Sequence, residues 1–479
     1  MLNYPKVTGF KTCEEFSRYL TQEGWDIGLA TKIPADGTAA LARKISWQGR
    51  TIGNRWAILP MEGWDCEANG VPSEFTKRRW MHFATSGAKL ICGTEAGAVI
   101  PSGRGNPRQL LVNRQTLPAL KQLVKEMRKA HRDKFGTDDD LCIGLQLTHS
   151  GRFSHPNFDD RPEPVTAYGH PLLDIKFNCS AENIIGDEAI GHVTDCFAEA
   201  AQVAYEAGFD FVDVKHAHGY LGHEFLTAIG RPGPYGGSFE NRTRFCREIL
   251  DKIRSRTPRI GLAVRLSIFD TMPFIKGADG VGIPMQWPAG TPYPYAFGGD
   301  GSGLEMDPLL TEPVKFVKML QGYGINLICA SIGSPYYSVH LQRPAYYPVS
   351  DGYLMPEPPL RNVGRHLQAV RELRKSCPGI FTVASGLTCL QEFLPNAAEY
   401  AVENRWTDFA GIGRMAISYP DICHDVLEGN TLNRCRICRT FGECTNAPRN
   451  GMISGCYPLD EFYKNRPEAA ILRNLKKTR

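Results

Sequence analysis

Short apolar runs alternate with longer amphipathic stretches from residue 55 to about residue 415. Such runs are typical of buried strands, and apolar positions repeating every three or four residues are typical of helices. Eight strand-like runs are visible: Trp56–Pro60, Leu90–Glu95, Leu141–Leu147, Phe211–Lys215, Ile260–Ser267, Asn326–Ile332, Phe381–Ser385 and Phe409–Arg414. Helix-like stretches between them include Leu117–Arg132, Asp187–Ala207, Phe239–Ser255, Thr311–Tyr323, Val363–Ser376 and Leu390–Glu403. This α/β alternation predicts right-handed βαβ units, and eight strands predict a closed (β/α)₈ TIM barrel.

Long loops follow three of the predicted strands. They span residues 148–180, 270–306 and 333–359, and they are rich in glycine, proline and aromatic residues. In a barrel of this kind the chemistry lies at the carboxyl ends of the strands and in the loops that follow them. We therefore expect these loops to form binding walls around a site, with a subunit interface as the alternative.

Polar side chains gather where the fourth predicted strand ends. Lys215, His218 and Tyr220 lie within six residues of one another, and Asp213 shares a strand face with Lys215. A cation, an imidazole and a phenol in one place can polarise a carbonyl group and deliver a proton. We interpret Lys215, His218 and Tyr220 as candidate catalytic residues.

Other strand ends carry groups suited to a flat, anionic cofactor. Gln146 ends the third strand and Arg265 lies in the fifth, where an amide and a guanidinium suit the polar edge of a heterocycle. The last two strands end in glycine-containing turns, and the backbone N–H groups of such turns can approach a phosphate. The residues of these turns are Ser385, Gly386, Gly413 and Arg414.

The segment 411–416 also matches the GxGxxG/A fingerprint of dinucleotide-binding domains. A Rossmann unit would continue with a helix, a strand and an acidic residue about 20 positions further on. The chain instead reaches a proline and a group of cysteines, so we reject that interpretation.

Four of the 15 cysteines are crowded near the carboxyl end with the spacing C-x₂-C-x₅-C-x₁₁-C. They are Cys435, Cys438, Cys444 and Cys456. Four thiolates can bind a zinc ion or a [4Fe–4S] cluster, and unliganded cysteines are the third alternative. The other eleven are scattered, several in apolar runs, which is typical of small buried side chains.

Composition adds mainly exclusions. A formal net charge of +4 over 479 residues is too weak to indicate nucleic acid or an anionic membrane as a partner. We find no apolar run of the roughly 18 residues needed to span a bilayer, and no secretory signal pattern at the amino end. These observations favour a cytoplasmic protein without a membrane partner.

Several motifs together resemble the old yellow enzyme family, from about Gly53 to Tyr463. They are NRWAILPM (54–61), LICGTEAGAVIPSGRG (90–105), LQLTHSGR (145–152), VKHAHGYLGHEFL (214–226), YGGSFENRTRF (235–245), VRLS, SG and GIGR. The chain is most similar to the branch with 2,4-dienoyl-CoA reductase and trimethylamine dehydrogenase, but without C-terminal nucleotide-binding domains.

The resemblance implies noncovalently bound FMN. By position, Pro60, Met61 and Gly93 would contact the isoalloxazine ring through backbone groups, Gln146 would pair with its pyrimidine edge, and Arg265 would stabilise the reduced flavin. Gly386, Gly413 and Arg414 would hold the phosphate. Members of the branch carry a similar cysteine quartet after the last strand, which favours a [4Fe–4S] cluster.

The family motif after the fourth strand begins with a histidine, where this chain has Lys215. The leading hypothesis is reduction of an activated C=C bond of the enone or enoate type. Reduced FMN would supply hydride to the β-carbon, Lys215 and His218 would polarise the carbonyl, and Tyr220 would protonate the α-carbon. The alternatives are an amine dehydrogenase or demethylase that passes electrons through the cluster to an external acceptor, and a noncatalytic electron-transfer subunit.

The predicted organisation has three parts. Residues 1–44 form an N-terminal extension that caps the barrel base or contacts another subunit, residues 45–430 the FMN-binding barrel, and residues 431–479 an iron–sulfur-binding segment. The expected partners are a small-molecule substrate and either NAD(P)H or an electron-transfer protein, with a homo-oligomer possible.

Overall fold

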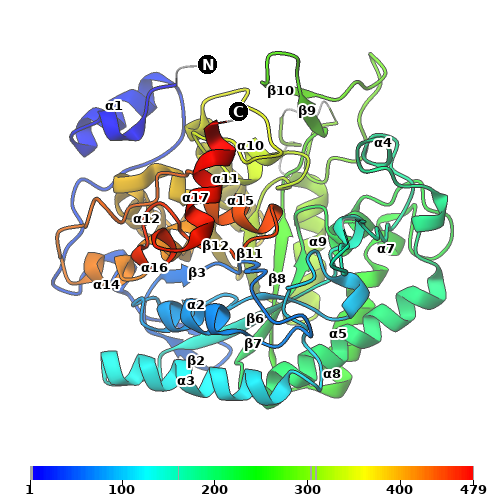
Figure 1. The fold of residues 1–479 in the computed structure, drawn as a ribbon, viewed down its shortest axis with the longest axis horizontal. Coiled ribbons are helices and arrows are strands. Elements are labelled where there is room, and N and C mark those ends of the chain that lie inside the picture. Colours follow the sequence, from blue (N-terminus) through cyan, green and yellow to red (C-terminus); the bar gives the residue numbers. More distant parts are fainter. Residues whose placement is uncertain (1–3, 160, 302–304, 308–309, 478–479) are drawn as a thin grey trace.

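A closed barrel of parallel strands forms the centre of the molecule (Figure 1). The computed structural model describes residues 4–159, 161–301, 305–307 and 310–477. The strands of the barrel are β3 (Trp56–Ile58), β4 (Leu90–Ile91), β6 (Cys142–Thr148), β7 (Phe211–His216), β8 (Gly261–Ser267), β11 (Leu327–Ser331), β12 (Phe381–Ala384) and β13 (Phe409–Ile412). Each pairs in parallel with its neighbours, and β4 closes the ring by pairing with both β3 and β6. The predicted (β/α)₈ barrel is confirmed.

Side chains alternate between the interior of the barrel and the helical layer outside it. On β7, Phe211 packs inside the barrel, whereas Val212 and Val214 belong to the large core beneath the helices. The same alternation places Asp213 and Lys215 on the inner side, as the period of two requires. Lys215 lies opposite Arg265 of β8 in the strand register. The inner face therefore changes from apolar to charged toward the carboxyl ends of the strands.

Helices surround the barrel in chain order, as the alternating pattern predicts (Figure 1). The longer ones are α2 (Glu74–Ala84), α3 (Leu117–Phe135), α5 (Asp187–Ala207), α8 (Arg244–Arg256), α9 (Thr311–Gly322), α11 (Pro359–Ser376) and α12 (Leu394–Glu403). Shorter helices are α4 (Leu173–Phe177), α6 (Leu221–Leu226), α7 (Phe239–Arg242), α10 (Val339–Gln342), α13 (Arg414–Ser418) and α14 (Ile422–Leu427).

Two predicted helices are divided in the structure. The stretch Phe239–Ser255 forms α7 and α8, which meet at Thr243. The stretch beginning at Leu390 starts as the 3-10 helix η7 (Leu387–Phe393), and Gln391 within it has a positive φ of 53°. Pro395 lies in the first turn of α12, where a missing N–H costs no hydrogen bond.

The segments before the first barrel strand and after the last one pack against several parts of the barrel. The hairpin of β1 (Ile45–Trp47) and β2 (Arg50–Ile52) places Trp47 against Phe211 at the amino ends of the strands. Helix α1 (Cys13–Gln22) packs through Phe16 on Phe393 of η7. The carboxyl end forms α15 (Glu443–Arg449), α16 (Glu461–Lys464) and α17 (Pro467–Lys477), and Asp460 there forms an ion pair with Arg78 of α2.

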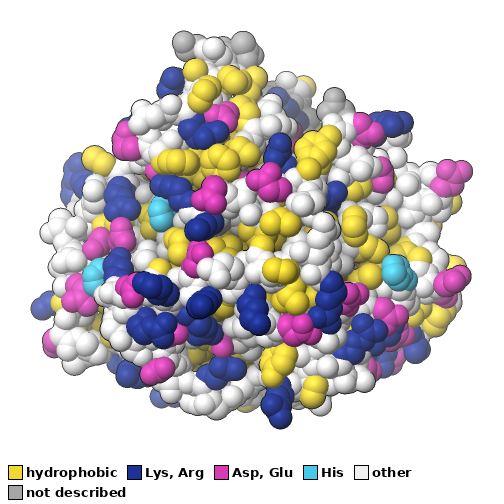
Figure 2. Space-filling view, turned by 60° about the horizontal axis from the view of Figure 1, so that its bottom comes forward, with side chains coloured by type: hydrophobic (Ala, Val, Ile, Leu, Met, Phe, Trp, Pro, Cys, Tyr) yellow, Lys and Arg dark blue, Asp and Glu magenta, His cyan; other side chains and the backbone are white. Residues whose placement is uncertain are grey.

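The surface mixes charges of both signs. Figure 2 shows lysine and arginine side chains interspersed with aspartate and glutamate over one face, with hydrophobic side chains between them. Within the described part of the chain, no helix is both long enough and apolar enough to cross a lipid bilayer.

Candidate active site

An open cavity of about 220 Å³ lies where the barrel strands end. It brings together most of the residues predicted for the site: Pro60, Met61, Gln146, Lys215, His218, Tyr220, Arg265, Ser385, Gly386, Gly413 and Arg414. Gly93 does not line it but lies behind Pro60, since a Cβ built on Gly93 would be 2.5 Å from the Pro60 Cβ.

Lys215 and Tyr220 share a carboxylate that no sequence pattern singled out. The Lys215 Nζ lies 2.7 Å from Oε1 of Glu62, and the Tyr220 hydroxyl donates to Oε2 of Glu62 over 2.8 Å. The same ammonium group lies 3.4 Å from the centroid of the Tyr220 ring. The Tyr336 hydroxyl is 3.0 Å from that of Tyr220. The cation and the phenol are therefore parts of one buried, hydrogen-bonded group.

His218 is held in an unusual backbone conformation beside this group. Its φ is +67°, a value uncommon in residues other than glycine, although histidine adopts it more often than most. Its ring Nε2 lies 2.9 Å from the Ser331 hydroxyl, and its backbone N–H donates to Ser267 over 3.0 Å. Burial, together with the charges of Arg265 and Lys215, holds the pKa of His218 well below 6.5. At neutral pH the imidazole is therefore uncharged.

Gln146 and Arg265 present polar edges toward the cavity. The Gln146 amide donates to Oδ2 of Asp213 over 2.7 Å, which leaves its carbonyl oxygen to accept a hydrogen bond. Arg265 donates through Nη1 to the Pro60 carbonyl over 2.9 Å, and its Nε has no partner among the described residues. Burial raises the pKa of Asp213 to about 6, while Gln146 and Arg265 lower it.

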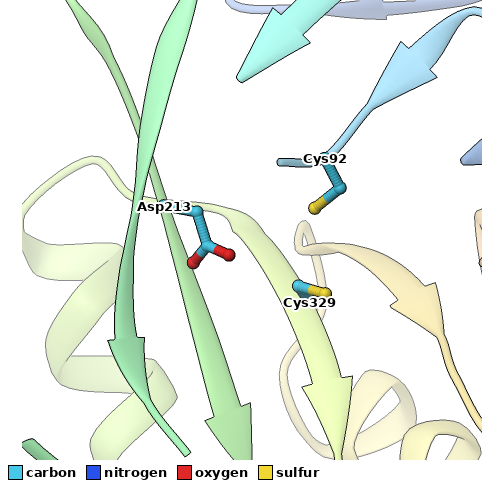
Figure 3. A group of neighbouring side chains, drawn as sticks. All are labelled: Cys92, Asp213 and Cys329. Atoms are coloured by element: carbon cyan, nitrogen blue, oxygen red, sulfur yellow. The ribbon is translucent and has the colours of Figure 1, made fainter. Parts of the chain in front are cut away.

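Asp213 also faces two cysteines inside the barrel. Figure 3 shows its carboxyl group pointing toward Cys92 and Cys329, which come from the β4 and β11 sides of the barrel. One ligand atom from each residue lies within 4.8 Å of the other two. A hydrogen bond with Cys329 and burial raise the pKa of Cys92 well above 9, whereas metal ligation requires a thiolate. The group is better explained as two core thiols beside the Asp213 carboxyl group, whose Oδ1 has no partner among the described residues.

Two arginines lie at the glycine-rich end of the cavity. Arg414 donates through Nη2 to the Pro344 carbonyl over 3.0 Å, and its Nη1 has no partner among the described residues. Arg343 lines the same cavity and donates to the Thr445 hydroxyl over 2.6 Å. Burial and the positive charges of Arg414 and Arg449 lower the pKa of Arg343 to about 9. In the described part of the chain, no carboxylate forms an ion pair with Arg343 or Arg414, and this end of the cavity suits an anion.

Gly386 lies in the turn at this end of the cavity. It has a φ of +82°, and a Cβ at this position would lie 2.6 Å from the His366 ring. Only glycine fits both conditions, because other residues are strained at positive φ and carry the Cβ. Gly386 also lines the cavity, so the turn presents backbone and no side chain at this position.

Three of the four clustered cysteines line a second, smaller cavity. These are Cys438, Cys444 and Cys456, whereas the Cys435 side chain is exposed and is not part of that lining. Burial raises the pKa of Cys456, and the nearby Cys438 and Cys444 raise it further. Arg414, Ile417 and Cys444 line both cavities, so the cysteine segment adjoins the main cavity.

The long aromatic loops do not all contribute to the main cavity. The loop after β11 supplies Pro335, Tyr336, Gln342 and Arg343. The loop that contains β9 (Phe274–Lys276) and β10 (Gly282–Pro284) instead lines a separate small cavity, together with residues of the loop after β6. Among the described tyrosines, those found on the main cavity are Tyr220 and Tyr336.

Similarity to known proteins agrees with this geometry. Residues 44–283, about half of the chain, match the sequence model of the NADH:flavin oxidoreductase / NADH oxidase family. An NADPH dehydrogenase of Listeria innocua is 28% identical over 403 residues, which cover 83% of this chain and 94% of the relative. An NADPH dehydrogenase of Clostridium acetobutylicum is 30% identical over 209 residues, 43% of this chain and 57% of the relative.

A solved structure supports the fold. The structure of a 2-naphthoyl-CoA reductase in complex with 2-naphthoyl-CoA superposes with a TM-score of 0.63 at 18% identity. The superposition covers 89% of this chain and 57% of the other, so the chain spans little more than half of that protein. The family match, the ordered motifs and the barrel agree, and the chain belongs to the NADH:flavin oxidoreductase / NADH oxidase family, the old yellow enzyme family that its motifs indicated.

Proposed function

We propose that this protein is an FMN-dependent oxidoreductase that reduces an activated C=C bond of an enone or enoate. NAD(P)H or an electron-transfer protein supplies the electrons. The observation that carries the proposal is the buried Lys215–Glu62–Tyr220 group, which places two proton-bearing side chains on the same cavity as the residues suited to a flavin.

The cavity has the groups that FMN requires at each end. Gln146 has a carbonyl oxygen available for the pyrimidine edge, and Arg265 lies beside it with an Nε that no described residue engages. Gly386, Arg414 and Arg343 offer an open backbone and two cations without carboxylate partners among the described residues for a phosphate. Buried donors without partners are costly in a folded protein, so a bound anion would stabilise this arrangement.

FMN held by these residues would, once reduced, supply hydride for the electron-poor β-carbon of the substrate. Lys215 and the neutral His218 would polarise the carbonyl group, since negative charge develops on its oxygen during the reaction. Tyr220 would donate its proton to the α-carbon. Burial, Glu62 and Tyr336 raise the pKa of Tyr220 well above 10, so the phenol is protonated and ready to donate throughout the neutral range.

We further propose that the C-terminal segment, residues 431–479, holds a [4Fe–4S] cluster through Cys435, Cys438, Cys444 and Cys456. Three of these cysteines line one cavity, next to Arg414 of the main site. The exposed Cys435 would have to approach the other three when the cluster binds. Anaerobically purified protein should contain about four iron atoms per chain. One equivalent of zinc without iron would contradict the cluster and favour a structural zinc site.

The cavity does not favour oxidation of a cationic amine. Among the described residues, the only carboxylate on its lining is Glu62, which Lys215 already neutralises. The tyrosines of the β9–β10 loop line a different cavity and do not form an aromatic cage around the site. Reduction of a carbonyl-activated double bond instead requires a cation and a proton donor, and Lys215 and Tyr220 can supply these.

Anaerobic titration tests the proposed function. Purified protein should show the absorbance of oxidised flavin, and NADPH or NADH should bleach it. Adding an enone such as cyclohexenone should then restore the oxidised spectrum. If methylamines bleach the flavin while the nicotinamides do not, the protein is an amine dehydrogenase instead.

A further inference from the structure

Glu62 accepts hydrogen bonds from three side chains at once. Lys215 approaches Oε1 at 2.7 Å, whereas Tyr220 and the Trp64 indole approach Oε2 at 2.8 and 3.1 Å. The Glu62 side chain is only 12% exposed and that of Lys215 only 4%. The carboxylate thus joins the segment after β3 to the segment after β7, across the mouth of the barrel.

Buried hydrogen bonds and ion pairs hold the backbone next to Glu62. The N–H of Gly63 donates to Oε1 of Glu95 over 2.6 Å, and Arg79 forms ion pairs with both Asp65 and Glu95. Arg79, Asp65 and Glu95 are all buried, and the Arg79 guanidinium fills the space that a side chain at position 63 would occupy. These contacts hold the turn that carries Glu62, so its approach to Lys215 does not depend on a free loop.

Lys215 needs a counter-ion to stay charged at this depth. Burial lowers the pKa of Lys215, and the positive charge of Arg265 lowers it further. The negative charge of Glu62 raises this pKa, and Asp213 raises it by a smaller amount. The other titratable neighbours on the cavity are His218, which is neutral, and the protonated Tyr220 and Tyr336. Glu62 is therefore the main source of negative charge for this ammonium group.

We propose that Glu62 is a positioning residue that holds Lys215 and Tyr220 as one unit at the mouth of the barrel and keeps both of them protonated. Two loaded proton donors would then face the carbonyl compound together. This role rests on the proposed reduction of an enone or enoate, and it adds to that reaction a residue that touches neither the carbonyl nor the double bond.

The charge of Lys215 can be titrated without measuring turnover. Cyanate is small and reacts only with an uncharged amine, so the pH dependence of Lys215 carbamoylation in the flavin-loaded protein, followed by peptide mass spectrometry, reports its pKa. In Glu62→Gln the apparent pKa should fall by about one unit, which is about a tenfold faster reaction at a fixed pH below it. Glu62→Asp, which keeps the charge, should shift it less.

Glu67→Gln is the matched control, because Glu67 lies in the same segment but is exposed. It should leave the Lys215 titration at its wild-type position. If Glu62→Gln also leaves the titration unchanged, or speeds carbamoylation equally at every pH, the proposed role is wrong. An equal increase at all pH values would mean only a looser structure around the lysine.

A second readout links Glu62 to the reaction. In pre-reduced wild-type protein, the rate of cyclohexenone reduction should decrease at alkaline pH as Lys215 loses its proton. In Glu62→Gln this decrease should begin at a lower pH. If the decrease begins at the same pH in both proteins, the proposed role of Glu62 is contradicted. If the wild-type protein reduces no enone, the proposed function fails, and the cyanate titration still decides the role of Glu62 by itself.

Discussion

At the scale of single residues, the proposed reaction depends on Lys215 and Tyr220. Their side chains are in contact, with the ammonium 3.4 Å from the centre of the phenol ring, and both are bound to Glu62. A lysine acts as a point charge, whereas a histidine would offer one directed N–H, so we expect the proposed polarisation of the carbonyl to depend on the distance from Lys215 more than on its orientation. In the proposed reaction, the Tyr220 hydroxyl is the proton donor with the more defined direction.

Removal of the Tyr220 hydroxyl should slow proton delivery. We expect Tyr220→Phe to lower the rate of enone reduction by about 10²–10⁴-fold, the usual contribution of a general acid. Reduction of the flavin by NADPH should stay within about twofold of the wild-type rate, since it needs no proton from Tyr220. Stopped-flow measurement of the two half-reactions separates these effects.

Tyr205→Phe serves as the control, because Tyr205 is 41% exposed near the carboxyl end of α5, which leads into the amino end of β7, and it does not line the cavity. It should leave both half-reactions unchanged. Wild-type rates of enone reduction in Tyr220→Phe would show that another group, or water, delivers the proton.

Arg343 should discriminate FMN from riboflavin. Loss of a charged hydrogen-bonding group to a phosphate costs about 1.5–3 kcal/mol, so Arg343→Gln should weaken FMN binding about 10- to 100-fold. Riboflavin has no phosphate, and its affinity should hardly change. Flavin fluorescence titration of the apoprotein measures both affinities.

Arg361→Gln, at a half-exposed arginine of α11, is the control and should leave both affinities unchanged. Equal weakening of both flavins by Arg343→Gln would exclude a phosphate contact.

The sequence indicated the strand-end residues but not their partners. Lys215, Gln146 and Arg265 could be predicted because each lies in or just after an apolar strand whose period places it on the inner face. Glu62 and Arg343 lie in irregular segments without such a period. Glu62 is 153 positions from Lys215, and only closure of the barrel brings the two side chains together. No local sequence pattern predicts that contact.

At the scale of elements, helix α5 shows how local signals set the boundaries. Asp187 and Glu188 in its first turn favour the amino end of the helix dipole, and Gly208 ends it with a φ of +96°. The predicted and observed bounds agree there. They differ around residues 239–256 and 387–403, where Thr243 and Gln391 interrupt stretches whose helical pattern continues across the break. Periodicity alone does not reveal a break that tertiary packing imposes.

Two glycines of α5 should respond oppositely to alanine. Gly208→Ala forces a Cβ into the left-handed region and should destabilise the protein by about 1–2 kcal/mol. Gly191 lies inside the helix, and a Cβ added there would have no other atom within 4 Å, so Gly191→Ala should stabilise the protein by up to about 1 kcal/mol. Urea unfolding curves measure both changes. A stabilising Gly208→Ala would mean that the cap relaxes to another conformation.

At the scale of the whole molecule, buried histidines should make stability depend on pH. Burial lowers the pKa of nine histidines below 6.5, and among them His149, His216 and His366 reach about 4. The unfolded chain binds protons at these sites below pH 6.5 while the folded protein does not. The free energy of unfolding should therefore fall as the pH decreases from about 6.5 to about 4.

A smaller opposing effect comes from buried carboxyls with raised pKa values. Burial raises the pKa of Glu95 and Asp270 to about 7 and of Asp213 to about 6, and it also raises that of Glu224. These groups favour the folded state at low pH, but the histidines outnumber them. Urea midpoints measured between pH 7.5 and 5 should decrease. A constant or rising midpoint over that range would show that the histidines are charged in the folded protein.

The central claim is that a flavin bound at the mouth of this barrel passes hydride to an activated C=C bond. The most direct test is a single anaerobic turnover, in which protein reduced with one equivalent of NADPH is mixed with cyclohexenone. The account predicts that the oxidised flavin spectrum returns and that one equivalent of cyclohexanone forms per flavin. A flavin that stays reduced in excess enone, with no cyclohexanone formed, would contradict it.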